Sequence, residues 1–85
     1  MYFVYSKKFR KMFEKCPSSI QGKCLERLLV LQENRHDSLL RSHKLTGKYI
    51  GFQSINITGD WRVVYKENGD EIVLSTIGTH SQLYK

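Results

Sequence analysis

The sequence has no apolar run long enough to cross a bilayer, and its start, MYFVYSKKF, holds too short an apolar stretch for a signal peptide. It contains one proline, two cysteines and no glycine-rich loop of the P-loop kind. Cys16 and Cys24 lie in helix-like sequence, at a spacing that fits neither a paired metal-ligand motif nor a disulfide framework. These absences predict a cytoplasmic protein with two reduced, packed thiols.

Acidic residues are also scarce, because 8 Asp and Glu stand against 14 Lys and Arg, giving a formal net charge of +6 and a pI of about 9.5. Such a bias predicts attraction to polyanions, namely nucleic acid, an anionic membrane or an acidic protein. Many small proteins are basic for solubility alone, which is the alternative reading of the charge. The length of 85 residues predicts one domain, residues 1–85.

The periodicity of apolar residues predicts a strand, two amphipathic helices and then a meander of three strands. The predicted elements are Tyr2–Tyr5, Lys7–Lys15, Pro17–Gln32, Lys48–Ile57, Asp60–Lys66 and Glu71–Gly78, followed by a tail from Thr79. Gly51 interrupts the alternation of its strand and predicts a bulge. The fold class is α+β, with the helical hairpin on one face of a small twisted antiparallel sheet of about four strands. The other face is expected to stay open as a working surface.

The stretch from Ile55 to Tyr65, INITGDWRVVY, has two faces once it is extended. Trp61, Val63 and Tyr65 share one face and are expected to pack under the helical hairpin. Arg62 lies on the other face, with Asp60 at the strand entry. The strand therefore predicts a core on one side and charged groups on the other.

Four polar residues, His43, Asp60, Arg62 and His80, fall at the ends or on the exposed face of the predicted sheet. The histidines lack metal-ligand spacing, so no metal or other cofactor is expected. No activated serine or nucleophile elbow is present for a hydrolase triad.

RNA cleavage needs fewer protein groups, because the substrate supplies its own nucleophile, the 2′-hydroxyl. The protein must supply a base for the hydroxyl proton, an acid for the leaving 5′-oxygen and cations for the charged transition state. Histidine, carboxylate and arginine or lysine form that set, and an aromatic residue such as Tyr84 can stack on an unpaired base.

Three motifs resemble a known family when they are taken together and in order. They are R-x-H-K-L-x-G at Arg41–Gly47, G-D-W-R-V-V-Y at Gly59–Tyr65 and I-G-T-H-S-x-L-Y at Ile77–Tyr84. The chain is similar to the RelE/ParE toxin superfamily, and most similar to its YafQ-type branch of messenger-RNA interferases. The length and the order of elements fit along essentially the whole chain.

The resemblance implies a ribosome-dependent endoribonuclease toxin of a type II toxin–antitoxin pair, which cuts messenger RNA in the ribosomal A site. It also implies a small acidic antitoxin that neutralises the toxin. His80 matches the C-terminal catalytic histidine, Tyr84 the aromatic position that closes the motif, and His43 the histidine before Leu-x-Gly. Asp60 matches the acidic residue of the third strand, and Arg62 the arginine used against the phosphate.

These matches predict His80 as general acid, and either Asp60 or His43 as base or orienting group. The predicted phosphate clamps are Arg62, Lys44 and Lys48. Asn56 stands where YafQ-like proteins usually have a histidine; it can donate a hydrogen bond to RNA but cannot titrate. Two alternatives therefore stay open: a non-catalytic basic RNA- or ribosome-binding protein of the same fold, and a ParE-like toxin that inhibits DNA gyrase.

Overall fold

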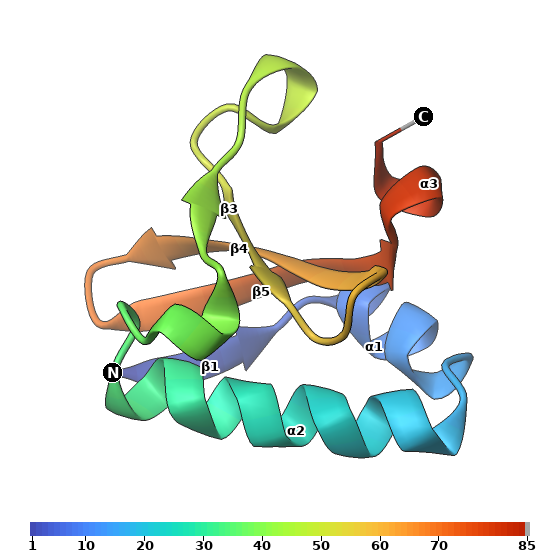
Figure 1. The fold of residues 1–85 in the computed structure, drawn as a ribbon. Coiled ribbons are helices and arrows are strands. Elements are labelled where there is room, and N and C mark those ends of the chain that lie inside the picture. Colours follow the sequence, from blue (N-terminus) through green and yellow to red (C-terminus); the bar gives the residue numbers. More distant parts are fainter. Residues whose placement is uncertain (85) are drawn as a thin grey trace.

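The computed structural model describes residues 1–84, so Lys85, the last residue of the predicted tail, lies outside the described residues. The helices and strands are β1 (Tyr2–Tyr5), α1 (Lys7–Glu14), α2 (Ser18–Glu33), the 3₁₀ turn η1 (Ser38–Leu40), β2 (His43–Lys44), the 3₁₀ turn η2 (Gly47–Tyr49), β3 (Gln53–Asn56), β4 (Trp61–Asn68), β5 (Glu71–Thr79) and α3 (His80–Leu83). Figure 1 shows their arrangement.

The two long helices begin where the sequence predicts. The Ser6 hydroxyl accepts a hydrogen bond from the backbone N–H of Phe9 at 3.0 Å, which caps the first turn of α1. Pro17 immediately precedes α2, where its missing N–H costs nothing. None of the helices described here has the length and apolar character that a membrane span requires.

The sheet has five strands in the order β1-β5-β4-β3-β2, and it is mixed rather than antiparallel. β1 runs parallel to β5, with Tyr2 opposite Glu71 and Tyr5 opposite Leu74, while the other pairs are antiparallel. The predicted α+β class is confirmed, but the sheet has five strands rather than about four, and β1 is parallel rather than antiparallel to its neighbour. The helices carry the chain from β1 at one edge to β2 at the other, so the meander ends with β5 beside β1 and in the same direction.

The predicted strand over Lys48–Ile57 is in fact shorter and divided. Its first residues form η2, because Gly47 and Gly51 have positive φ values of 64° and 89°, which leave the extended region. Only Gln53–Asn56 is strand, and the additional short strand β2 pairs with it. The bulge expected at Gly51 is absent from the described sheet there; the register shifts instead between Val64 and Tyr65 of β4.

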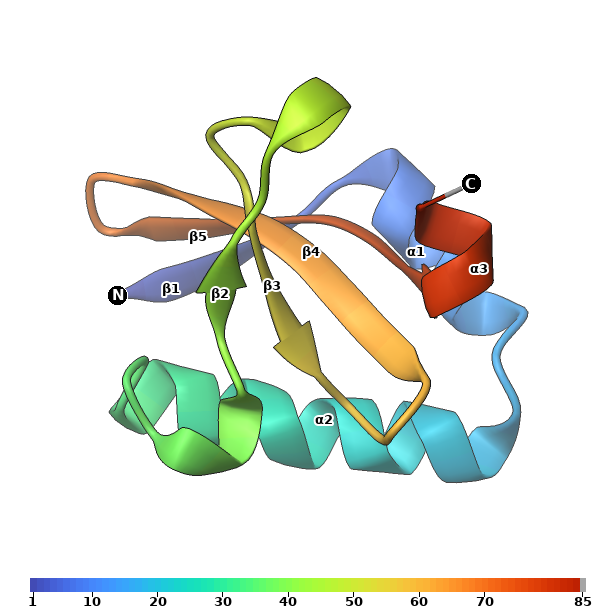
Figure 2. The ribbon, with the colours of Figure 1, turned by 45° about the horizontal axis from the view of Figure 1, so that its top comes forward.

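One face of the sheet packs on the helices and holds the core. Figures 1 and 2 both show α2 running beneath the sheet. Val63 and Tyr65 are buried in the main apolar cluster and Trp61 packs against it, as the sequence predicts. On α2 the buried residues are Cys24, Leu28 and Leu31, whereas Leu25 and Leu29 are exposed.

The opposite face is partly covered, contrary to the prediction of an open surface. The tail folds into α3, which begins with a capping box: the Thr79 hydroxyl accepts from the N–H of Gln82, and the Gln82 side chain accepts from the N–H of Thr79. α3 lies on the side of the sheet away from α2 (Figure 1). Its Leu83 is buried, and a Cβ added to Gly78 would lie 3.2 Å from Leu83 Cδ2.

Candidate functional site

Strand pairing places a set of polar residues on the sheet face opposite α2. Directly paired residues share a face, and the register pairs Arg62 with both Asn56 and Gly78. It also pairs His43 with Ser54, which lies two residues before Asn56 on the same strand. We call this surface, defined by His43, Ser54, Asn56, Arg62 and Gly78, the polar face.

One corner of the polar face brings Asp60 and His80 together. The backbone N–H of His80 donates to the carbonyl of Asp60 at 3.0 Å, and the adjacent residues Trp61 and Thr79 are paired between β4 and β5. Both the Asp60 and the His80 side chains are exposed. The sheet register therefore joins the backbones of two residues that are far apart in sequence, one with a carboxylate and one with an imidazole, and both residues are exposed.

Aromatic rings support this corner from the side of α3. The Tyr84 ring lies 4.8 Å from the His80 ring and 5.9 Å from the ring of Tyr49, in both cases edge-on. Tyr49 belongs to η2, so this contact joins α3 to the connection between β2 and β3. Lys48 places its Nζ 5.3 Å from the Tyr49 ring centroid, which brings an ammonium group to the same end of the face.

His43 is held through both of its ring nitrogens. Nδ1 lies 3.1 Å from the carbonyl oxygen of Arg41, and Nε2 lies 3.1 Å from the hydroxyl of the buried residue Ser54. A carbonyl only accepts, so Nδ1 carries the proton in this contact. When His43 is neutral, Nε2 accepts from Ser54, and the ring has no nitrogen left for a substrate proton.

Arg62 and Asn56 line a pocket of about 430 Å³ at the turn between β3 and β4. Arg62 Nη1 donates to the carbonyls of Thr58 (3.2 Å) and Gly59 (2.9 Å), which hold the guanidinium against the turn. Two further arginines, Arg27 from α2 and Arg41 after η1, complete the wall. We call it the three-arginine pocket.

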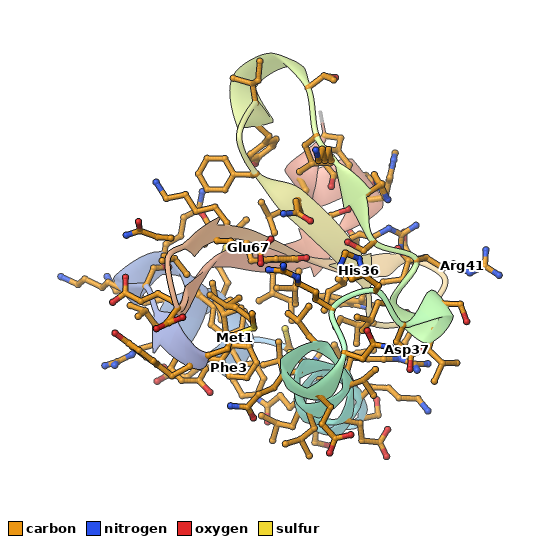
Figure 3. The ribbon with its side chains drawn as sticks, turned by 90° about the vertical axis from the view of Figure 1, so that its left-hand side faces the viewer. Met1, Phe3, His36, Asp37, Arg41 and Glu67 are labelled. Carbon is orange, nitrogen blue, oxygen red and sulfur yellow. The ribbon has the colours of Figure 1, made fainter. Side chains whose placement is uncertain are left out.

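Figure 3, in which α2 is seen end-on, shows Arg41 on the opposite side of that helix from Met1 and Phe3. The pocket therefore lies toward the β2–β3 edge of the sheet, whereas β1 forms the other edge.

The predicted site residues thus divide into three groups. Asp60, His80 and Tyr84 meet at one corner, with Lys48 nearby; Asn56 and Arg62 line the pocket; and His43 and the exposed Lys44 sit on β2. Within residues 1–84, no hydrogen bond or ring contact joins His43 to His80.

Sequence reasoning assigned no role to several residues that the fold brings to this surface. Ser54, Tyr49, Arg27 and Arg41 are the residues in question. Arg41 opens the first of the three motifs, and its positive φ of 46° places it in the left-handed region that ends η1. Arg27 gave no signal, because an arginine on an amphipathic helix reads as part of a solvated face.

Comparison with solved structures finds the same fold in toxins. YafQ from E. coli strain BL21(DE3) matches with a TM-score of 0.80 over 98% of this chain and 97% of that chain, at 22% identity. A copper-bound mutant toxin from Helicobacter pylori matches with a TM-score of 0.79 over 99% of both chains, at 28% identity. The E. coli DinJ-YafQ toxin-antitoxin complex gives a TM-score of 0.77, covering 98% of this chain and 96% of that chain at 23% identity. Comparison with curated protein sequences gives no match.

The sequence itself matches a family over its whole length. Residues 1–85 match the family described as "Bacterial toxin of type II toxin-antitoxin system, YafQ". This match confirms the resemblance carried by the three motifs, and the mixed sheet with its three α-helices agrees with the solved toxin structures. The chain is therefore a member of the YafQ family of bacterial type II toxin–antitoxin toxins.

Proposed function

We propose that residues 1–85 form one toxin domain that acts as a ribosome-dependent endoribonuclease on messenger RNA. The observation that carries this proposal is the corner where the exposed Asp60 and His80 are joined through their backbones at 3.0 Å. A general base and a general acid are thereby held on one surface of a protein whose formal net charge is +6.

The reaction follows from the chemistry of these groups. The 2′-hydroxyl oxygen of the substrate attacks the adjacent phosphorus, the bond from phosphorus to the 5′-oxygen breaks, and a 2′,3′-cyclic phosphate forms. Asp60 takes the proton of the 2′-hydroxyl, and His80 gives a proton to the leaving 5′-oxygen. Tyr84 holds the His80 ring by its edge-on contact and offers an aromatic surface to a base.

His43 acts as an orienting group rather than the base. Its two ring nitrogens are engaged by Arg41 and Ser54, so accepting a substrate proton would break a hydrogen bond to a buried hydroxyl. Lys44 and Lys48 are exposed, and Arg62 keeps donors beyond its Nη1; all three contribute cations to the RNA backbone.

We further propose that a small acidic antitoxin neutralises this toxin. A relative of the same fold has been solved as the E. coli DinJ-YafQ toxin-antitoxin complex. The excess of 14 Lys and Arg over 8 Asp and Glu gives an acidic partner a complementary surface.

Purified protein added to a translating extract should cut the message at codon-defined positions. Replacing His80→Ala should lower the cleavage rate by about 10²- to 10⁴-fold, which is the usual contribution of a general acid. His36→Ala is the matched control, because His36 is also an exposed histidine but lies outside the polar face. It should cut at the wild-type rate.

Primer extension on the message reads the cut positions. Intact message with wild-type protein would overturn the proposal. Ribosome binding without cleavage would identify a non-catalytic binding protein instead. Loss of DNA supercoiling by gyrase, independent of His80, would identify a gyrase inhibitor.

A further inference from the structure

The three-arginine pocket carries positive charge that no ion pair balances within residues 1–84. Arg27, Arg41 and Arg62 line it, and none of its lining residues is acidic. Among residues 1–84 the ion pairs join Lys23 to Glu26 and Arg35 to Glu67, so the pocket arginines take part in none. Three guanidinium groups around one hollow repel one another, and an anion that enters relieves this repulsion.

Two residues that line this pocket also have unpaired polar atoms. Three buried side-chain atoms lack a hydrogen-bond partner in the described part of the chain, and two of them, Arg27 Nε and Asn56 Oδ1, belong to residues that line this pocket. An unpaired buried donor or acceptor costs free energy and calls for a physical explanation. Pairing both atoms requires an acceptor for the Arg27 Nε–H and a donor for Asn56 Oδ1.

We propose that the three-arginine pocket binds a phosphate of the RNA backbone outside the cleaved position, and that Asn56 accepts a hydrogen bond from the neighbouring ribose 2′-hydroxyl. This inference rests on the proposed function. The last side-chain torsion of asparagine is soft, so the Asn56 amide can turn its oxygen toward the ligand. The phosphate oxygens accept from the guanidinium groups in the forked geometry that arginine favours.

The polar face links this pocket to the corner that holds Asp60 and His80. Asp60 lies in the turn between β3 and β4, directly after the pocket residues Thr58 and Gly59. A strand of RNA that places one phosphate near His80 can therefore continue across the turn to the pocket. A volume of about 430 Å³ is within the range of small-ligand sites.

An acidic protein segment fits these features less well. An ionised carboxylate side chain offers acceptors to the arginines but no donor, so the donor for Asn56 Oδ1 would have to come from a second group of the segment, such as a backbone N–H. A ribose hydroxyl next to a phosphate supplies both. Asparagine at position 56, in place of a titrating residue, then serves recognition: its neutral amide can bind the hydroxyl, and the charge of the amide does not depend on pH.

Inorganic phosphate is the first probe, read by nuclear magnetic resonance on ¹⁵N-labelled protein at constant ionic strength. The chemical-shift changes should saturate with phosphate concentration and should be largest at the Asn56 side-chain amide, the Arg27 Nε–H and the Gly59 backbone amide. Arg27→Gln should weaken phosphate binding several-fold, and Arg10→Gln is the control because it removes the same charge from α1, away from the pocket. Shifts spread evenly over the lysines, or shifts that Arg27→Gln leaves unchanged, would overturn the inference.

Ribosomes provide the second probe, using His80→Ala protein so that RNA cleavage is too slow to disturb the binding measurement. The slope of log affinity against log salt concentration should fall by about 0.7 for each pocket arginine replaced, the increment for single-stranded nucleic acid. Arg41→Gln tests this, and Arg41→Lys keeps the charge while removing the fork. A change seen only with message-loaded ribosomes assigns the phosphate to messenger RNA, whereas a change with empty ribosomes as well assigns it to ribosomal RNA; either supports the site.

The two proposals fail in different ways. If codon-positioned cleavage is unchanged by Arg27→Gln and Arg41→Gln, the proposed phosphate site is wrong and the proposed endoribonuclease activity stands. If phosphate changes the chemical shifts and the arginine substitutions alter the salt dependence of binding, but no message is cut, the protein has an RNA-binding pocket and is not an endoribonuclease. Pocket shifts caused by a cognate antitoxin but not by phosphate would assign the pocket to protein recognition and overturn the inference.

Discussion

The two faces of the sheet differ in how completely their groups are satisfied. On the helix face, Ile55, Val63 and Ile77 sit opposite one another in register and are fully buried in one apolar cluster. On the polar face, the row beside them pairs Asn56, Arg62 and Gly78, and Asn56 has a buried oxygen without a partner. A difference of one residue in strand position therefore separates packing from recognition.

This contrast indicates which substitutions should lower the stability of the protein and which should lower its activity. Changes on the helix face remove dispersion contacts and leave cavities, so they lower the free energy of unfolding. Truncating the solvent-accessible side chains of the polar face removes groups that contribute little to packing, so it should leave stability nearly intact. The following substitutions test whether the two faces are separable in this way.

The largest loss of stability is expected on the helix face of α2. Leu31 is fully buried, and Leu31→Ala should lower the free energy of unfolding by about 2–5 kcal/mol. Leu29 lies on the same helix but is 62% exposed, so Leu29→Ala should change it by less than about 0.5 kcal/mol. Urea titration followed by circular dichroism measures both. Equal effects of the two substitutions would show that the helix face is not the core.

A middle effect is expected at Gly78, where α3 closes on the polar face. A Cβ there would lie 3.0 Å from Gln82 Oε1 and 3.2 Å from Leu83 Cδ2, so these two α3 side chains must give by a few tenths of an ångström to admit it. Gly78→Ala should cost about 1–3 kcal/mol of unfolding free energy, as overpacking does, and should slow cleavage because His80 begins α3.

Gly22 supplies the matched control for that substitution. It lies in α2 with no atom within 4 Å of an added Cβ, so Gly22→Ala should stabilise the protein by about 0.5–1 kcal/mol. Thermal unfolding and the cleavage assay together read both variants. A Gly78→Ala protein with wild-type stability and activity would show that α3 is not packed on the sheet as described.

Local features of the fold were predictable from sequence because their causes are local. The Ser6 cap of α1 and the proline before α2 each act within a few residues. The parallel pairing of β1 with β5 was not, since Tyr2 and Glu71 are far apart in sequence and no local pattern states which edge a first strand will join.

The helix α3 has a local sequence signal, a capping box, that the prediction of a tail overlooks. Thr79 and Gln82 have the spacing of a capping box, yet the stretch after β5 was predicted as a tail. The missing helix matters for the site, because it carries Tyr84 against His80 and covers Gly78. Predicting an open face followed directly from missing it.

The sequence predicts which polar residues lie at the ends and on the exposed face of the sheet, but not how they group. The backbones of Asp60 and His80 are hydrogen-bonded, and the rings of His80 and Tyr84 are in contact, since strand ends converge at one edge of a meander. Arg62 was expected beside them, but its guanidinium bonds to the turn carbonyls and lines a separate pocket. Alternation along a strand gives the face of a side chain, whereas the direction of a long flexible side chain depends on acceptors that only the folded turn provides.

The smallest effect concerns Cys24 and the response of the helix face to pH. Burial, with a smaller contribution from the nearby Cys16, raises the pKa of the Cys24 thiol from its ordinary 9.0 to about 12. The folded protein then keeps a proton that the unfolded chain loses above pH 9, so this thiol favours the folded state at lower pH and that stabilisation declines as pH rises from 9 toward 12. Between pH 8 and pH 10 the loss should be on the order of 1 kcal/mol.

Urea titrations at pH 8 and pH 10, in the presence of a reducing agent, measure that loss. Cys24→Ala should be less stable than wild type at both values because it leaves a cavity, but its stability should fall less between them. The loss of unfolding free energy in wild type minus the loss in Cys24→Ala gives the contribution of Cys24 alone, because tyrosines and lysines that titrate in the same range affect both proteins. If wild type and Cys24→Ala lost equal stability between pH 8 and pH 10, the thiol would have to be hydrated in the folded state, and the helix face would be less tightly closed than its fully buried residues indicate.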